Sequence, residues 1–308
     1  MNSLLSADDR VALAAHFGER VRFDETLASF TWWKIGGPAD AFITVVCAND
    51  VAFLMRFAFK RRIPWFVLGL GSNILVGDGG LRGLVLQLAG DFDALDVRTD
   101  GNEVLVSAGA SAQMALLTAQ AASHGAISIG SLAGIPGSVG GALFMNAGTD
   151  REIGEFVREV WVQTPQRPDA HAVSVQYFYR HTTLARDSIV SRVVLAFSKG
   201  DPAGVRAEMQ ARLVRRKATQ PIAVPNAGSC FRNPPGDRAG RLIEAAGAKG
   251  WRVGGAEVST LHANFIVNIE SAKARDVTTL LARVRRAVGD QFGIDMQLEV
   301  HLVGEFVA

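Results

Sequence analysis

Short hydrophobic runs typical of strands alternate with stretches of helical periodicity through the first two thirds of the chain. The runs predict strands over residues 42–47, 66–68, 84–88, 104–107 and 189–197. Apolar residues at helical spacing predict a helix over residues 50–61. We expect a second helix to begin with Ser111 as its N-cap and to end at Gly125.

The pattern changes near residue 200, where Ser198-Lys199-Gly200-Asp201-Pro202 has the composition of a turn. A helix is predicted directly after it, with Val205, Met209 and Leu213 on one face and the basic run Arg215-Arg216-Lys217 at its end. We therefore predict a first domain over residues 1–200, with subdomains of about 1–85 and 86–200. A second domain is predicted over residues 201–308.

The second domain is predicted to end in a helix between two strands. Ser271 is expected to open this helix and Gly293 to stop it, with strands over residues 265–269 and 297–303. In the last strand Leu298, Val300 and Leu302 are expected to form an apolar face, while Glu299 and His301 face the other way.

Composition and charge exclude several classes of protein. Hydrophobic residues make up 48% of the 308 residues and charged residues 20%, which is ordinary for a globular protein. The formal charge is only +2, which disfavours nucleic acid as a partner. No apolar run approaches the roughly 20 residues that span a bilayer, so no membrane insertion is expected. No secretory signal is recognised at the N-terminus.

Cysteine and histidine do not suggest a disulfide framework or a metal site. Cys47 and Cys230 form no CxxC pair, which favours a reducing, cytoplasmic location. The six histidines lack the spacing of metal ligands, so no metal is predicted. We expect a monomer.

Glycine is concentrated in two segments. The stretch from Gly130 to Gly148 contains six glycines, whereas about two are expected from the average usage in this chain. A second cluster, Gly69-Leu70-Gly71-Ser72-Asn73, follows the strand that ends at Leu68. Glycines allow backbone N–H groups to approach an anion closely, as a pyrophosphate requires.

Neither glycine segment matches a standard nucleotide motif. No Gly-Lys-Ser/Thr is present, and no GxGxxG opens a helix with an acidic residue some twenty positions later. The alternative is that these glycines only form tight turns. From the spacing alone both interpretations stay open.

Longer strings carry a resemblance to a known family. In the first half these are Thr31-Trp32-Trp33-Lys34-Ile35-Gly36-Gly37-Pro38-Ala39, Gly69-Leu70-Gly71-Ser72-Asn73 and Ala133-Gly134-Ile135-Pro136-Gly137-Ser138-Val139-Gly140-Gly141. In the second half they are Tyr179-Arg180, Gln220-Pro221, Ala227-Gly228-Ser229-Cys230-Phe231-Arg232-Asn233-Pro234, Ala239-Gly240-Arg241-Leu242-Ile243-Glu244, Ser259-Thr260-Leu261-His262-Ala263-Asn264-Phe265 and Leu298-Glu299-Val300. In this order, from about residue 25 to the C-terminus, they closely resemble the UDP-N-acetylenolpyruvoylglucosamine reductase family.

The chain resembles the shorter type of that family. The stretch between Arg180 and Ile189 leaves no room for the insertion that carries a substrate-binding tyrosine in the longer type. Two departures from the usual pattern are Trp32-Trp33 before Lys34 and Thr149-Asp150-Arg151 near the expected flavin.

The resemblance implies an α+β fold and a specific reaction. It implies a two-part FAD-binding domain of the vanillyl-alcohol-oxidase (PCMH) type, followed by a smaller α+β substrate-binding domain. Such enzymes hold FAD non-covalently and use NADPH to reduce UDP-N-acetylglucosamine-enolpyruvate to UDP-N-acetylmuramate for peptidoglycan. The partner implied is therefore a UDP-sugar substrate.

The resemblance also implies which residues bind the cofactor. We expect FAD at both glycine segments, on Gly69, Gly71, Ser72, Asn73, Ile74, Gly130, Gly134, Ile135, Pro136, Gly137, Ser138, Gly140, Gly141 and Asn146.

Three residues match the family's catalytic positions. Arg180 is expected to stabilise negative charge on the substrate carboxylate, Ser229 to donate a proton to C2, and Glu299 to act with Arg180. If Glu299 lies near that carboxylate, like-charge repulsion should raise its pKa and favour the protonated form. The alternatives are a surface ion pair for Arg180, a turn hydroxyl bonded to the backbone for Ser229, and a solvated strand residue for Glu299.

Other residues are expected to contact the substrate. They are Lys217, Asn233, His262 and Asn264. Lys217 has the alternative of an ordinary helix-end charge, and the others could equally order their loops.

Two other functions are alternatives to the reductase, a flavin oxidase and a non-catalytic nucleotide-binding protein. A flavin oxidase of the same fold often attaches FAD through a His or Cys beside the first glycine segment, and residues 69–73 contain neither. A non-catalytic nucleotide-binding protein would not need Arg180, Ser229 and Glu299 to match together.

Overall fold

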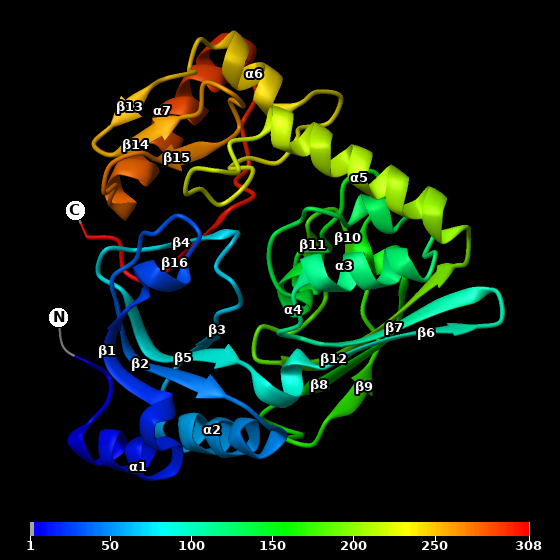
Figure 1. Ribbon diagram of the computed structural model, residues 1–308. Coiled ribbons are helices and arrows are strands. Elements are labelled where there is room, and N and C mark those ends of the chain that lie inside the picture. The colour runs from blue at the N-terminus through cyan, green and yellow to red at the C-terminus, as the bar shows by residue number, and fades with distance from the viewer. Residues whose placement is uncertain (1–2, 308) are drawn as a thin grey trace.

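A computed structural model of the chain describes residues 3–307. The chain begins with α1 (Ala7–Phe17) and a sheet whose strand order is β1–β2–β5–β3 (Figure 1). These strands are β1 (Val21–Thr26), β2 (Pro38–Val45), β5 (Leu81–Leu88) and β3 (Trp65–Val67). Helix α2 (Ala48–Arg61) packs on this sheet through residues such as Leu54 and Met55. The predicted helix over residues 50–61 is confirmed.

The next part of the chain forms an antiparallel sheet with the order β6–β7–β12–β8–β9. Its strands are β6 (Leu95–Asp100), β7 (Glu103–Gly109), β12 (Ile189–Ser198), β8 (Val157–Gln163) and β9 (His171–Val173). Helices α3 (Met114–Ser123) and α4 (Val139–Phe144) share a buried core with this sheet. The short strands β10 (Tyr177–Phe178) and β11 (His181–Thr182) form a separate hairpin.

Short 3-10 helices join several of these elements. They are η1 (Gly18–Arg20), η2 (Leu27–Phe30), η3 (Gly90–Asp93), η4 (Ile129–Ser131) and η5 (Ile153–Glu155).

Ser111 does not cap α3, so that prediction is wrong. The N-cap is Gln113, which makes no capping hydrogen bond with its side chain. The Ser111 hydroxyl instead donates to Asp93 Oδ1 at 2.7 Å, because the preceding 3-10 helix brings this carboxylate within reach.

The long helix α5 (Pro202–Thr219) leads from the second sheet to the last part of the chain (Figure 1). That part contains α6 (Ala239–Ala245), α7 (Ala274–Phe292) and a sheet ordered β13–β14–β15. The strands are β13 (Arg252–Val253), β14 (Ala256–Val258) and β15 (Ile266–Asn268). None of the helices within residues 3–307 is both long and apolar enough to cross a membrane.

Helix α7 ends at Gly293 as predicted but begins at Ala274, three residues later than expected. Ser271 has a positive φ of 48°, which is not helical. The first N–H groups of the helix, on Ala274 and Arg275, donate to the carboxylate of Asp78 at 2.8 and 3.0 Å. An acceptor 196 residues away therefore sets where this helix starts, in the way a local N-cap normally does.

The predicted strand over residues 297–303 is only partly formed. Regular pairing is confined to β16 (His301–Val303), which runs parallel to β4 (Ile74–Val76). The backbone N–H groups of Glu299 and Val300 both point to the carbonyl of Cys230, so the chain changes partners at this point. As a result Val300 is buried whereas Leu302 is 41% exposed, and the single apolar face expected here is absent.

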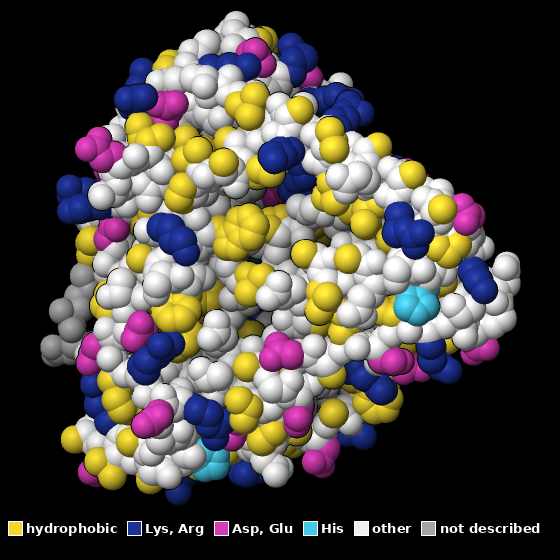
Figure 2. Space-filling view, viewed as in Figure 1, with side chains coloured by type: hydrophobic (Ala, Val, Ile, Leu, Met, Phe, Trp, Pro, Cys, Tyr) yellow, Lys and Arg dark blue, Asp and Glu magenta, His cyan; other side chains and the backbone are white. Residues whose placement is uncertain are grey.

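The last part of the chain packs on the first. Trp33 is fully buried in a core made mostly of residues from α6, α7 and β13–β15, and its Nε1 donates to the carbonyl of Ile266 at 2.8 Å. In the space-filling view the surface is hollowed where the parts meet, and hydrophobic side chains surround the hollow (Figure 2). The predicted α+β class is confirmed, while the boundary near residue 200 stays a prediction.

Candidate active site

The two glycine segments lie against each other although more than sixty residues separate them. The hydroxyl of Ser72 donates to the carbonyl of Pro136 at 2.9 Å. A Cβ on Gly69 would lie 2.8 Å from Ser138 Oγ, and one on Gly137 would lie 3.0 Å from Ser72 Oγ. The two segments therefore approach each other closely at these glycines and form one site.

Gly71 is restricted both by its backbone and by its surroundings. Its φ is +63°, a conformation that glycine adopts without strain. A Cβ there would lie 2.4 Å from the carbonyl oxygen of Phe30, whereas the Gly71 carbonyl accepts a hydrogen bond from Trp32 N–H at 3.1 Å. The segment Phe30–Trp32 thus packs directly against the first glycine turn and holds its backbone.

These segments fit a phosphate-bearing cofactor. The backbone N–H groups of Gly71, Ser72 and Gly137 donate no hydrogen bond to any group within residues 3–307. Free N–H groups on closely packed glycine turns are the donors that a pyrophosphate requires. Asn73, Ile74 and Ile135 belong to the same two segments, with Ile74 at the start of β4.

Some predicted cofactor residues have structural reasons for their identity. Gly130 is buried in η4, where a Cβ would lie 2.9 Å from Arg212 Cδ, and it is not brought to the first glycine segment. Gly140 lets α4 pack on Ala110, and Ser138 caps α4 by accepting from Gly141 N–H at 3.4 Å. Contact of Gly130, Gly140 and Gly141 with FAD stays a prediction.

Asn146 is buried at the end of the second glycine segment, with all its side-chain atoms engaged. Its amide donates to Glu152 and to the Phe178 carbonyl, and its oxygen accepts from Gly154 N–H at 3.0 Å. This side chain orders the surroundings of Glu152, and its contact with FAD stays a prediction.

Arg180 lies in the turn of the β10–β11 hairpin, with a φ of +56°. Its Nε donates to Glu299 Oε1 at 3.0 Å, its Nη1 to Glu152 Oε1 at 3.2 Å and its Nη2 to the carbonyl of Gly148 at 3.0 Å. The side chain is only 16% exposed, so this is no open surface ion pair. Three acceptors from different segments hold the guanidinium in one orientation.

The two carboxyl groups beside Arg180 are both harder to ionise than usual. Burial raises the pKa of Glu299 above its ordinary range, and the positive charge of Arg180 opposes this. Burial likewise raises the pKa of Glu152, against the same arginine. The predicted direction for Glu299 is thus found, but its cause in the structure is burial rather than repulsion by a substrate.

Ser229 is half-buried and follows Gly228, whose φ is +73°. Its hydroxyl makes no hydrogen bond to any residue between 3 and 307, so it is not the backbone-bonded turn hydroxyl of the alternative interpretation. Next to it, Cys230 accepts at its carbonyl from Glu299 N–H at 2.8 Å. Ser229 and Glu299 are therefore brought close through Cys230. Burial raises the pKa of the Cys230 thiol to about 12, which agrees with a core residue.

Asn73 links the glycine segments to these groups. Its amide donates to the Glu299 carbonyl at 3.2 Å, and its own carbonyl accepts from His301 N–H at 3.1 Å. The structure thus brings together one cofactor segment, Arg180, Glu299 and the loop of Ser229.

The predicted substrate residues are not equally available. Asn264 is buried and bonds both backbone groups of Phe231, at 2.9 and 2.8 Å. His262 accepts from Asn264 N–H at 3.2 Å, and burial lowers its pKa. Asn233 is exposed and accepts from Ala239 N–H at the start of α6, while Lys217 is exposed at the end of α5. Asn264, His262 and Asn233 thus each order a loop through hydrogen bonds to the backbone, and contact of all four residues with the substrate stays a prediction.

Sequence reasoning missed Glu152, Arg232 and Arg216. Glu152 adjoins the second glycine segment and Arg232 lies within the string 227–234, but nothing in the spacing of either residue pointed to Arg180. Arg232 reaches the Arg180 carbonyl with Nη2 at 3.4 Å, and its buried Nε has no partner among residues 3–307. Arg216 was assigned only to a basic helix end.

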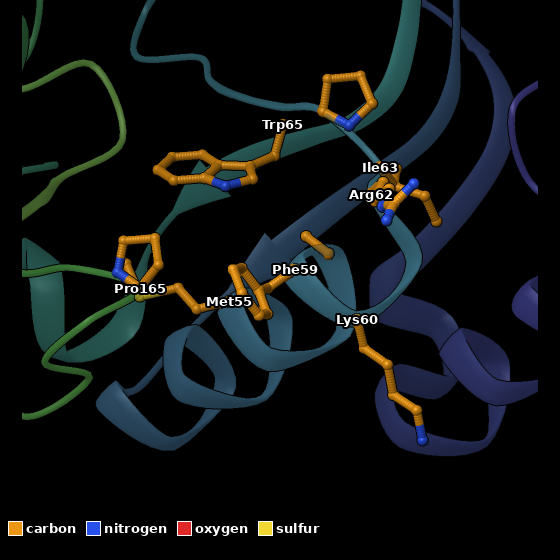
Figure 3. Close-up of a pocket in the computed structure, with 9 residues that line it drawn as sticks. Met55, Phe59, Lys60, Arg62, Ile63, Trp65 and Pro165 are labelled. Carbon is orange, nitrogen blue, oxygen red and sulfur yellow. The ribbon is translucent and has the colours of Figure 1, made fainter.

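A separate hollow of about 610 Å³ lies between α2 and β3 (Figure 3). Met55, Phe59 and Trp65 line it, with Lys60 and Arg62 at its edge. The residues that line it include none from the two glycine segments and none of Arg180, Ser229 and Glu299, so the hollow is separate from the site.

No group of three or more His, Cys, Asp or Glu residues that could hold a metal ion occurs among residues 3–307.

Comparison with known proteins points to one family. Residues 220–303 match the model of the "UDP-N-acetylenolpyruvoylglucosamine reductase, C-terminal domain", and residues 39–165 match that of an "FAD binding domain". A protein named UDP-N-acetylenolpyruvoylglucosamine reductase from Moorella thermoacetica is 42% identical over 289 residues, covering 93% of this chain and 94% of that protein. One of the same name from Myxococcus xanthus is 41% identical, covering 99% and 100%.

A solved structure is also similar. The crystal structure of the reductase of that name from Thermus caldophilus has a TM-score of 0.79 at 34% identity, covering 92% of this chain and all of that one.

Proposed function

The chain belongs to the UDP-N-acetylenolpyruvoylglucosamine reductase family, and from this premise we propose that it is a flavin-dependent reductase. The substrate proposed is UDP-N-acetylglucosamine-enolpyruvate, the product UDP-N-acetylmuramate, a precursor of peptidoglycan, and the reductant NADPH. The observation that carries the proposal is the direct bond between Arg180 and Glu299, beside the loop of Ser229 and beside Asn73 of a glycine segment.

The proposed reaction requires three contributions. A hydride must reach C3 of the enolpyruvyl group, negative charge on the carboxylate must be stabilised, and a proton must reach C2. FAD, held non-covalently on the two glycine segments, would supply the hydride. The chain itself would supply the other two.

Arg180 is the group proposed to stabilise the substrate carboxylate. Its guanidinium is permanently charged and planar, which suits a carboxylate whose charge increases as C3 is reduced. Its bonds to Glu299, Glu152 and Gly148 hold it before the substrate arrives, so little reorientation is needed during the reaction.

Glu299 is proposed to act with Arg180 in its protonated form. Burial favours that form, and an approaching substrate carboxylate would favour it further by like-charge repulsion. A protonated Glu299 can donate a hydrogen bond to the substrate carboxylate, which an ionised one cannot.

Ser229 is proposed to deliver the proton to C2. Its hydroxyl makes no hydrogen bond within residues 3–307 and is half-buried, so it is available to a ligand. A hydroxyl is a weak acid, and such a transfer is effective only towards a basic carbon in a site from which water is excluded.

Localisation in the cytoplasm and use of NADPH are parts of the same proposal. The cytoplasm is where the nucleotide substrate and NADPH would both be supplied.

The proposal is tested by separating the two half-reactions. The purified protein should be yellow, NADPH should bleach the flavin absorption, and its recovery without oxygen should require UDP-N-acetylglucosamine-enolpyruvate. Ser229→Ala should abolish this recovery and leave the bleaching unchanged. Recovery driven by oxygen alone, with alcohols or sugars as electron donors, would instead identify a flavin oxidase.

A further inference from the structure

Helix α5 lies across α3 and the second glycine segment (Figure 1). Val205 and Met209 on its inner face pack against the core beneath it. Two further residues of α5, Leu213 and Arg216, approach Gly134. These positions follow one another at helical spacing, so Arg216 continues the packed face of α5 with a charged side chain.

Arg216 has no counter-charge within residues 3–307. It is half-buried, and its guanidinium forms neither an ion pair nor a hydrogen bond there. Its neighbour Arg212, one turn earlier, is bonded to both carboxylate oxygens of Asp150 at 2.7 and 2.9 Å and to Glu208 at 3.0 Å. Burial lowers the pKa of Arg216, and no carboxylate offsets this. A half-buried guanidinium that faces no carboxylate keeps its forked donors available, and an anionic ligand is the partner that suits them.

Gly134 determines where this guanidinium lies. Its φ is +72°, and a Cβ there would lie 3.0 Å from Arg216 Cδ and 3.6 Å from Arg216 Nη1. The absence of a side chain allows the arginine to reach the backbone of the glycine segment. Pro136, two residues further on, bonds Ser72 of the first segment. The cation is therefore next to the site in which the two glycine segments meet.

We propose that Arg216 binds the pyrophosphate of FAD and closes the phosphate site over the second glycine segment. A pyrophosphate diester carries two negative charges and accepts hydrogen bonds from a guanidinium in a forked geometry. The free N–H groups of the glycine turns and Arg216 would then contact the same group. This inference rests on the FAD binding in the proposed function, but not on the reduction of the UDP-sugar.

The diphosphate of the UDP-sugar is the other source of this chemistry. The contact between Arg216 and Gly134 favours FAD, because Gly134 belongs to a segment that packs against Gly69–Asn73. The experiment separates the two sources by measuring each ligand in turn.

The test compares Arg216→Met, which keeps much of the aliphatic stem, with Arg216→Lys and the control Arg206→Met. Arg206 is exposed near the start of the same helix and forms no ion pair within residues 3–307. Deflavinated protein would be titrated with FAD and with riboflavin, which lacks the pyrophosphate. We expect Arg216→Met to raise the Kd for FAD about ten- to a hundredfold, the range of a charge-assisted contact. Arg216→Lys should raise it less, and riboflavin binding and Arg206→Met should be unaffected.

Three results would overturn the proposal. If Arg216→Met weakened the binding of FAD and of riboflavin equally, Arg216 would only support the fold. A lower Tm of the deflavinated variant would accompany this result. An unchanged Kd for FAD in Arg216→Lys and Arg216→Met would exclude the contact. Unchanged FAD binding with a raised KM for the UDP-sugar would assign Arg216 to the substrate. A wild-type protein that binds FAD but does not reduce this sugar would refute the proposed function and leave this test valid.

Discussion

Arg180 and Glu299 are 119 residues apart in the chain, and Arg180 Nε donates a hydrogen bond to Glu299 Oε1 at 3.0 Å. The arginine comes from a hairpin turn, and the glutamate from a backbone stretch that changes partners between Cys230 and Asn73. Both side chains are less than one fifth exposed. The pair therefore depends on the docking of the last part of the chain on the earlier ones.

Arg180→Lys should lower turnover without removing the flavin. A lysine carries its donors on one nitrogen, so it cannot span the three acceptors that Nε, Nη1 and Nη2 of Arg180 contact separately. We expect kcat to fall by about 10²–10³, the effect of losing one preorganised donor. Stopped-flow recovery of the flavin absorption with substrate measures this, and bleaching by NADPH is the control. An unchanged recovery rate would exclude Arg180 from the reaction.

The stability of the protein should depend on pH through Glu299. Because its pKa is raised in the folded state, the folded protein binds more protons than the unfolded one above the ordinary value of 4.5. This contribution to stability is complete below that pH and is lost as pH rises through the raised pKa. The side chain of the Glu299→Gln variant does not titrate. As pH rises from 4.5 through the raised pKa, the free energy of unfolding of this variant should therefore increase relative to that of the wild type. Urea denaturation at several pH values measures the difference. Parallel curves for the two proteins would show that Glu299 has an ordinary pKa.

Gly71→Ala should destabilise the protein more than the same substitution at a glycine of an open turn. A Cβ at this position meets the Phe30 carbonyl at 2.4 Å, and the φ of +63° adds strain. Gly101→Ala is a matched control, because Gly101 has a φ of +56° with nothing within 4 Å of a Cβ. We expect the control to lose about 1 kcal/mol and Gly71→Ala to lose more, together with bound flavin. Equal losses of stability in thermal unfolding of the two variants would contradict the close contact.

Asn264→Leu should separate ordering of the Ser229 loop from substrate binding. The amide of Asn264 satisfies the N–H and the carbonyl of Phe231, two residues after Ser229. Removing it leaves both groups buried without partners, at a cost of about 1–3 kcal/mol each. We expect lower stability in denaturant titrations, with a reduced kcat because Ser229 is displaced. A raised KM with unchanged kcat and stability would instead favour direct substrate contact.

Several elements were predictable because their causes are local. The helix over residues 50–61 has its apolar stripe in the sequence, and α7 ends at Gly293 because glycine adopts the left-handed φ of 67° there. Elements whose ends depend on distant partners were misjudged. The start of α7 depends on Asp78, and the last strand is interrupted because Glu299 and Val300 bond to Cys230 before His301 joins Asn73.

The candidate site divides in the same way. Arg180, Ser229, Glu299 and the glycine segments were recognised because each lies in a contiguous string that resembles the family. Arg232 lies in the same string as Ser229, but the resemblance gave it no role, and Glu152 and Arg216 lie in none of these strings. Glu152 and Arg232 contact Arg180, which is 28 and 52 positions away, respectively. Arg216 contacts Gly134, which is 82 positions away.

The sequence by itself determined the composition of the glycine segments, the periodicity of the main helices and the family to which the chain is similar. Only the tertiary structure decided that Ser72 meets Pro136, that Arg180 meets Glu299, and that Arg216 lies over Gly134 without a counter-charge. The physical reason is that backbone conformation and amphipathic spacing depend on neighbouring residues. Burial of a charge, and the partner that compensates it, depend on which distant segments pack together.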